Sequence, residues 1–145
     1  ILVGLNLSRG EVSQDLENIE PFANFHDSSG KAMDFKIRHA LKGSVGWGAY
    51  MTDIIKDLPE KDSSKVKRLL KSDKALVDRN IGTFQEEIRD LGSSNPTIIA
   101  FGNDAYEILD KNLGSIYNTV KVTHYAHYIS KEKYREHVLS VLRSV

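Results

Sequence analysis

The chain contains no cysteine among its 145 residues. This absence excludes disulfide bonds, a thiolate nucleophile and every zinc or iron–sulfur site that needs cysteine ligands. Long hydrophobic runs are also missing. The longest, such as Ile98–Phe101, have the length of a strand, whereas a membrane-spanning helix needs about 18 apolar residues or more. We therefore expect a protein without a membrane segment, in a reducing, cytoplasmic compartment.

Net charge is absent as well, because 20 basic residues balance 20 acidic ones. A neutral chain lacks the excess of lysine and arginine that usually marks a nucleic-acid-binding protein. The charges are unevenly distributed, however, and residues 36–80 and 121–145 are both basic. These two stretches either meet at one site or form ordinary solvated helix faces. The sequence leaves both interpretations open.

The amino-terminal end has neither an initiator methionine nor the pattern of a signal peptide. It begins with the apolar run Ile1–Leu5, which is typical of a buried strand, so we expect a missing segment upstream. The length fits one domain, which we place over residues 1–145.

Hydrophobic periodicity predicts four strands and five helices in the order β-α-β-α-α-β-α-β-α. The predicted strands are Ile1–Leu5, Ala49–Ile55, Thr97–Phe101 and Thr119–Thr123. Such alternation predicts an α/β fold in which helices cover both faces of a parallel sheet. We therefore expect a three-layer α/β/α architecture with a central four-stranded parallel sheet.

Local signals add detail to this plan. Thr83 with Glu86 forms a capping box, which predicts the start of a helix there. Asn103 is most simply the N-cap of the helix that follows the third strand. Trp47 stands between two glycines before the second strand, and we interpret it as core packing.

Ligands of open α/β sheets bind beyond the carboxyl ends of the strands. Asn6, Asp53, His124 and His127 lie at such positions. The chain has no Walker lysine and no complete G-x-G-x-x-G motif, so a P-loop NTPase and a Rossmann dehydrogenase fit poorly. Aspartate is disfavoured inside a strand, which favours a functional role for Asp53. The histidines have no carboxylate cluster beside them, and we predict neither a metal nor another cofactor.

Five segments, in this order and spacing, resemble the uracil-DNA glycosylase superfamily over nearly the whole chain. They are Gly4–Ser8, Phe22–Phe25, Gly48–Lys56, Ile98–Ala105 and His124–His127. In that family the first segment carries the water-activating motif, and the second carries an aromatic ring that stacks on the target base. The third reads the edge of the base, and the last resembles a His-Pro-Ser motif. The lack of cysteine restricts the resemblance to the branches without an iron–sulfur cluster.

The resemblance implies a monofunctional, metal-free and monomeric DNA glycosylase of base excision repair. It would hydrolyse the N-glycosidic bond of uracil or another modified base that is flipped out of DNA. The implied catalytic residues are Asn6, which would position the water, and His124, which would stabilise the departing base. The implied base-binding residues are Phe22, Asn24, Phe25 and Asp53. The implied DNA contacts are Ser8, His127, Tyr128 and Lys131.

Three positions depart from the family pattern. Leu7 and Tyr125 stand where proline is usual, and Asp53 replaces an asparagine. An ionised aspartate only accepts hydrogen bonds, whereas asparagine both donates and accepts. Asp53 therefore favours a base with an amino group, unless it is protonated. Two alternatives stay open: a catalytically altered glycosylase-fold protein that binds nucleic acid or nucleotides, and an unrelated flavodoxin-like or nucleotide-binding α/β domain.

Overall fold

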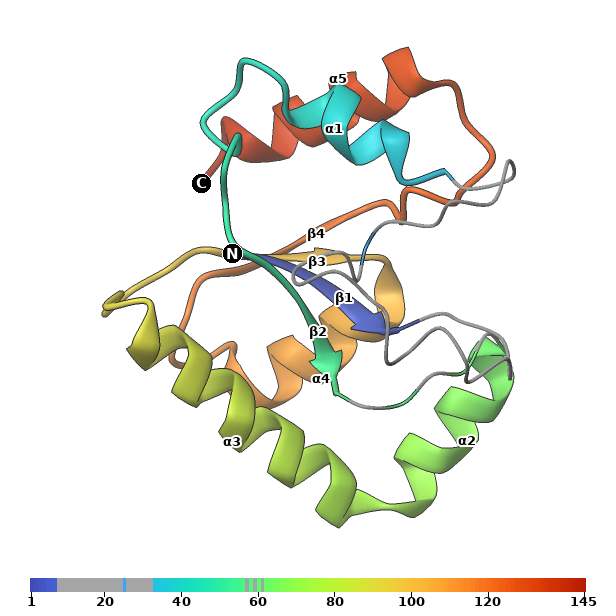
Figure 1. Cartoon of the computed structure of the whole chain (residues 1–145), viewed down its shortest axis with the longest axis vertical. Helices are drawn as coiled ribbons and strands as arrows, with labels where there is room; N and C mark the ends of the chain where they lie inside the picture. Colours follow the sequence, from blue (N-terminus) through green and yellow to red (C-terminus); the bar gives the residue numbers. More distant parts are fainter. Residues whose placement is uncertain (8–24, 26–32, 57, 59, 61) are drawn as a thin grey trace, which may run out of the picture.

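The computed structural model describes residues 1–7, 25, 33–56, 58, 60 and 62–145 (Figure 1). The strands are β1 (Leu2–Asn6), β2 (Met51–Ile55), β3 (Ile98–Phe101) and β4 (Thr119–Val122). The helices are α1 (Phe35–Leu41), α2 (Ser63–Ser72), α3 (Lys74–Asp90), α4 (Asn103–Leu113) and α5 (Lys131–Leu142). Their order along the chain is the predicted one.

All four strands are parallel, and their order across the sheet is β2-β1-β3-β4. The central strands β1 and β3 pair directly, so their neighbours β2 and β4 form the two edges. In the register of β1 with β2, Gly4 lies beside Asp53. At the other edge, Phe101 lies beside Val122.

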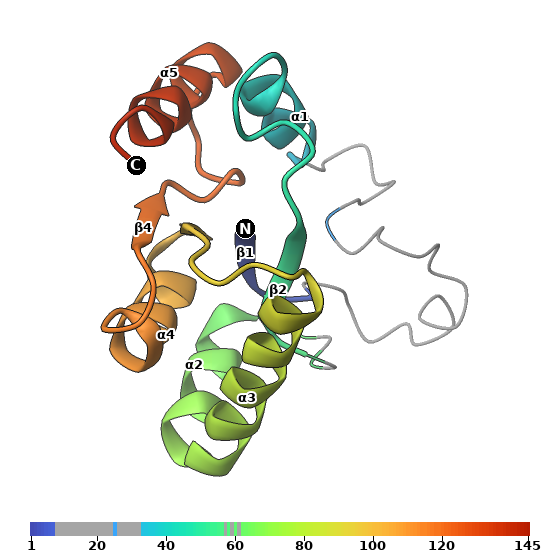
Figure 2. The ribbon, with the colours of Figure 1, turned by 90° about the vertical axis from the view of Figure 1, so that its left-hand side faces the viewer.

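Helices cover both faces of this sheet. Helices α1 and α5 lie together on one face, and α3 and α4 cover the other, with α2 against α3 (Figures 1 and 2). Each face has its own apolar core: Leu2 and Ile99 pack beneath α1 and α5, and Val3 and Ala100 pack against α3 and α4. Buried strands of this kind are short and apolar on both faces. The predicted three-layer α/β/α fold is confirmed.

Two predicted helix starts are wrong. Helix α3 begins nine residues before Thr83, with the Asp73 carboxylate as its cap, and the Thr83 hydroxyl donates to the Arg79 carbonyl. The N-cap of α4 is Gly102, whose φ of 86° suits a residue without a side chain. Asn103 is the first helical residue instead, and its side-chain oxygen accepts from Lys121 Nζ at 2.8 Å.

The prediction for Trp47 is wrong as well. Its side chain is 55% exposed, in a turn between α1 and β2. Backbone bonds from Trp47 N to the Ser44 carbonyl and from Ala49 N to the Gly46 carbonyl fix this turn, and Gly48 has a φ of 83°. Across the described part of the chain, the helices lack the combination of length and apolar character that crossing a membrane requires.

Candidate functional site

Residues of β1 and β2 meet beneath α1 and α5 at the middle of the two strands. Gly4 shares the face of Leu2 because side chains alternate along a strand, and its neighbour in β2 is Asp53. A Cβ atom at Gly4 would overlap the Asp53 carboxylate and would lie 2.9 Å from Phe25 Cε1. The glycine therefore leaves the space that Asp53 and Phe25 occupy.

A row of four rings crosses the same face from Phe25 to the end of β4. Phe25 lies 6.1 Å from Phe101, measured between ring centroids, and Phe101 lies 5.6 Å from Tyr125 in an edge-to-face contact. Tyr125 in turn stacks on His124 at 4.3 Å. The row links Asp53, at the β2 edge, to His124, just beyond the β4 edge. The resemblance assigns Asp53 and Phe25 to base binding and His124 to catalysis.

Asp53 is almost completely buried, with 7% of its surface exposed. Burial raises the pKa of its carboxyl group from 3.8 to about 6, while the Lys56 ammonium lowers the pKa and Glu87 raises it. Lys56 is itself engaged on the opposite face of β2, where it bonds the Thr52 hydroxyl and pairs with Glu87 at 2.7 Å. The Asp53 carboxyl group can therefore exist in either protonation state near neutral pH.

His124 follows β4, and its ring is oriented by the backbone. Nδ1 accepts a hydrogen bond from Ala126 N at 3.2 Å, so the neutral ring carries its proton on Nε2. Burial lowers the pKa of the imidazole, and the nearby Asp104 carboxylate raises it by a smaller amount. The turn at Gly102 passes close to the ring, since a Cβ atom there would lie 3.2 Å from His124 Cβ. His124 is thus a neutral hydrogen-bond donor at pH 7.

The loop that follows, residues 124–129, is held by short internal bonds and by α1. His127 N donates to the His124 carbonyl, and Ile129 N donates to the His127 carbonyl. The Lys36 ammonium reaches the same His127 carbonyl at 2.9 Å, although the lysine is only 4% exposed. The loop presents Tyr128, which is 99% exposed, to solvent. Lys36 is not among the site residues predicted from the sequence.

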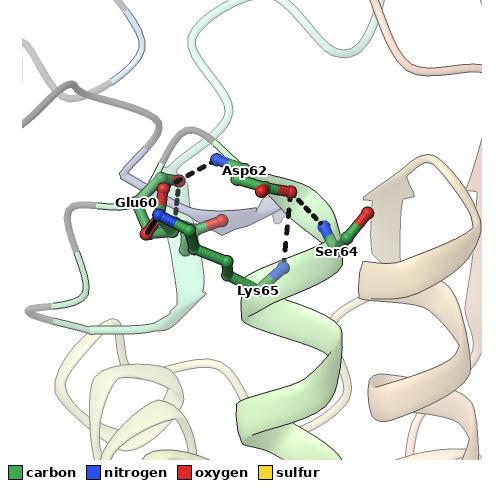
Figure 3. Close-up of polar contacts among 5 residues, drawn as sticks. Glu60, Asp62, Ser64 and Lys65 are labelled. Carbon is green, nitrogen blue, oxygen red and sulfur yellow. Dashed lines mark hydrogen bonds and ion pairs between the residues drawn. The ribbon is translucent and has the colours of Figure 1, made fainter.

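Asn6 has a clear structural role. Its amide group donates to the carbonyls of Leu58 and Glu60, at 2.8 and 3.0 Å. The Glu60 carboxylate accepts from Asp62 N, and the Asp62 carboxylate accepts from the backbone of Ser64 at the start of α2 (Figure 3). Asn6 therefore ties the end of β1 to the segment before α2.

Asn6 and His124 are not in direct contact in the described structure. Asn6 ends β1 and His124 follows β4, and strand β3 lies between these two strands, so β1 and β4 are separated by about 10 Å. Only a bound molecule that spans this width would touch both residues.

The remaining predicted site residues are spread around this face. His127, Tyr128 and Lys131 lie together in the loop and in the first turn of α5, and all three are exposed. Ser8, Phe22 and Asn24 lie outside the described residues. Within the part of the chain that the structure covers, no three histidine or carboxylate side chains are grouped so as to hold a metal ion.

Comparison of the chain with family models, curated proteins and solved structures finds no match. The resemblance to the glycosylase superfamily therefore rests on the sequence motifs alone.

Proposed function

We propose that this protein is a DNA glycosylase that removes a modified base from a flipped nucleotide. The observation that supports this proposal best is the row of rings between Asp53 and His124. A buried acid at one end can read the edge of a base, a ring beside it can stack on the base, and a neutral imidazole at the other end can donate a hydrogen bond. His124 lies beyond the carboxyl end of β4, where ligands of such sheets bind, and Asp53 lies at the middle of β2 on the same face.

Each residue has a role that fits its environment. Phe25 supplies a stacking surface, which in other proteins is worth about 1–3 kcal/mol per base. Asp53 accepts from an amino group when ionised, and both donates and accepts when protonated. Breaking the N-glycosidic bond places negative charge on the departing base. The Nε2–H group of His124 stabilises that charge, which is present only in the transition state.

Asn6 serves as the residue that orients the attacking water. Its two N–H donors are held by backbone carbonyls. Its side-chain oxygen has no partner among the described residues and can accept a hydrogen bond from water. An amide is too weak a base to deprotonate water, so the bond to the base must be largely broken before water attacks.

The loop at residues 124–129 carries an exposed side chain that can insert into the base stack of DNA. Flipping a base costs a few kcal/mol of lost stacking and pairing, and such proteins often insert an exposed side chain into the gap. Tyr128 is exposed on this loop, and the Lys36 ammonium donates a hydrogen bond to the His127 carbonyl of the same loop. Lys131, two residues beyond Ile129, is placed to meet a phosphate.

A gel assay tests the proposal. The purified protein is incubated with end-labelled single- and double-stranded oligonucleotides that contain uracil, hypoxanthine, xanthine or the amino-bearing base 5-methylcytosine, and alkali then cleaves the abasic sites. We expect cleavage of at least one substrate, a loss of about 100-fold or more in His124→Ala, and no loss in the control His39→Ala. Absence of cleavage on every substrate would remove the glycosylase proposal.

A second candidate is a non-catalytic module that binds nucleic acid or nucleotides with the same fold. The anchoring of the Asn6 amide between β1 and α2 favours it, because these hydrogen bonds give Asn6 a structural role that requires no catalysis. Retained oligonucleotide binding without cleavage would support this candidate.

A further inference from the structure

A cavity lies under α1, beside the turn at residues 46–49 and the first residue of β2. Its volume is about 450 Å³, within the range of small-molecule sites. Its apolar lining comes from three parts of the chain: Ile37 and Leu41 of α1, the segment from Trp47 in the turn to Met51 at the start of β2, and Phe25. The proposed catalytic residue His124 is not part of it.

The exposed side of this cavity is aromatic. Trp47, which lines the cavity, is 55% exposed although its turn is fixed by backbone bonds. Gly48 has a φ of 83° and leaves open space where a side chain would stand. A rigid indole at the mouth of an apolar cavity offers a flat surface on which a planar ring can stack.

Two charged groups at the rim could orient such a ring. Asp34 and Arg38 both line the cavity, and they are four residues apart at the start of α1, so they lie on one side of the helix. Guanidinium only donates hydrogen bonds, and carboxylate only accepts them. A ligand that fits this pair presents an acceptor and a donor on the edge of a flat ring. Nucleobases have this combination.

We propose that this cavity is a binding site for a nucleobase or nucleoside, separate from the site between Asp53 and His124. The base stacks on Trp47, and its edge is recognised by Arg38 and Asp34. Phe25 is common to both sites, because its ring lines the cavity and also lies against Gly4 beside Asp53. The proposal goes beyond the proposed function, since it requires no cleavage of a glycosidic bond.

The chain contains a single tryptophan, so its intrinsic fluorescence reports directly on this cavity. Wild-type protein is titrated with adenosine and with thymidine, and ribose serves as the matched ligand without a base. We expect a saturable change in Trp47 emission with at least one nucleoside and no change with ribose. Arg38→Ala should weaken binding about tenfold, whereas Arg79→Ala, an exposed arginine on α3, should leave it unchanged.

A second measurement does not depend on the fluorescence of Trp47. Saturation-transfer NMR observes the nucleoside itself, and its signal should be lost with Trp47→Leu. Flat titrations with both nucleosides, an equal response to ribose, or full binding by Trp47→Leu or by Arg38→Ala would overturn the proposal. Nucleoside binding by a protein that cleaves no oligonucleotide would remove the glycosylase proposal and leave this one standing.

Discussion

Asp53 carries the largest electrostatic cost in the proposed site. Its pKa in the folded protein, about 6, lies above the ordinary 3.8, so the folded state binds the proton more tightly than the unfolded chain. The contribution of Asp53 to stability is therefore fully present below about pH 4 and is lost as the pH rises through 6. Asp53→Asn removes this loss. We expect the variant to be more stable than the wild type at pH 8, by up to about 3 kcal/mol, and nearly equal at pH 4.

Urea unfolding at pH 4, 6 and 8 measures this difference. Asp90→Asn, at the exposed end of α3, is the matched control and should change little at any of the three values. A constant difference between Asp53→Asn and the wild type across the pH range would show that the carboxyl group does not titrate in this way. The same variant tests base selection, because asparagine presents a donor at every pH.

His124 leads to a prediction about the position of one proton. Because Nδ1 accepts from Ala126 N, the neutral ring must be protonated on Nε2. Burial lowers the pKa of the ring, so His124 should titrate below 6.5. Long-range ¹H–¹⁵N NMR spectra report the tautomer and the midpoint together, and His124→Gln assigns the signal. A proton on Nδ1 would leave no donor for the departing base and would contradict the proposed role.

Single residues differ in how far the sequence revealed them. Asp53 could be predicted as a candidate site residue, because aspartate is unfavourable inside a strand. Lys36 could not, because a lysine on an amphipathic helix normally reaches solvent. Only its spacing indicates burial, because Lys36 lies four residues before Ala40 and so on the buried face of α1. Its acceptor is 91 positions away in the sequence, so no local pattern could have identified the pair.

At the scale of elements, α1 acts as the support of the loop at residues 124–129. Lys36→Met keeps the length of the side chain and removes the bond to the His127 carbonyl. We expect a loss of about 1–3 kcal/mol in stability, since a charged hydrogen bond is removed from a buried site. The Ile129 amide, which also bonds to His127, should exchange its hydrogen faster. Hydrogen exchange measured by NMR tests both expectations.

Two comparison variants make this test specific. Lys42→Met alters an exposed lysine at the end of the same helix and should change neither stability nor exchange. Lys36→Arg retains a donor and should recover part of the loss. Unaltered exchange of the Ile129 amide in Lys36→Met would show that the loop holds its shape without α1.

The elements themselves were largely predictable, and their starts were less so. All four predicted strands are present to within a residue or two, because their apolar runs are short and bounded by polar residues. The capping box at Thr83 failed because a better cap lies upstream: the Asp73 carboxylate accepts from Leu76 N. Gly82 interrupts the helical pattern of α3 in the sequence, but burial of Phe84 and Ile88 outweighs its low propensity.

The whole molecule determines what no single element shows. The strand order β2-β1-β3-β4 depends on pairings between distant segments, and it alone brings Phe101 between Phe25 and Tyr125. The distribution of charge over the surface also depends on how the whole chain folds. The basic stretch 36–80 is divided between layers, because α1 packs beside α5 whereas α2 lies on the opposite side of the sheet (Figure 2). The two basic stretches therefore meet on the α1 side of the sheet, where α1 contacts α5 and Lys36 bonds to the His127 carbonyl.

This arrangement predicts that a neutral protein binds DNA through few phosphates. Each phosphate contact to a single strand contributes about 0.7 to the slope of log affinity against log salt. Lys131→Ala should reduce the slope by about that amount and weaken binding to every sequence alike. Tyr128→Ala should lower the affinity at every salt concentration and leave the slope unchanged, because a stacking side chain releases no counterions.

Fluorescence anisotropy with a labelled single strand, at several salt concentrations, separates the two effects. Lys111→Ala, on the solvent side of α4, is the control for a lysine in the opposite layer. A reduced slope in Lys111→Ala together with a full slope in Lys131→Ala would place the nucleic acid on the α4 side. The row of rings between Asp53 and His124 would then face away from the strand and could not receive a base from it.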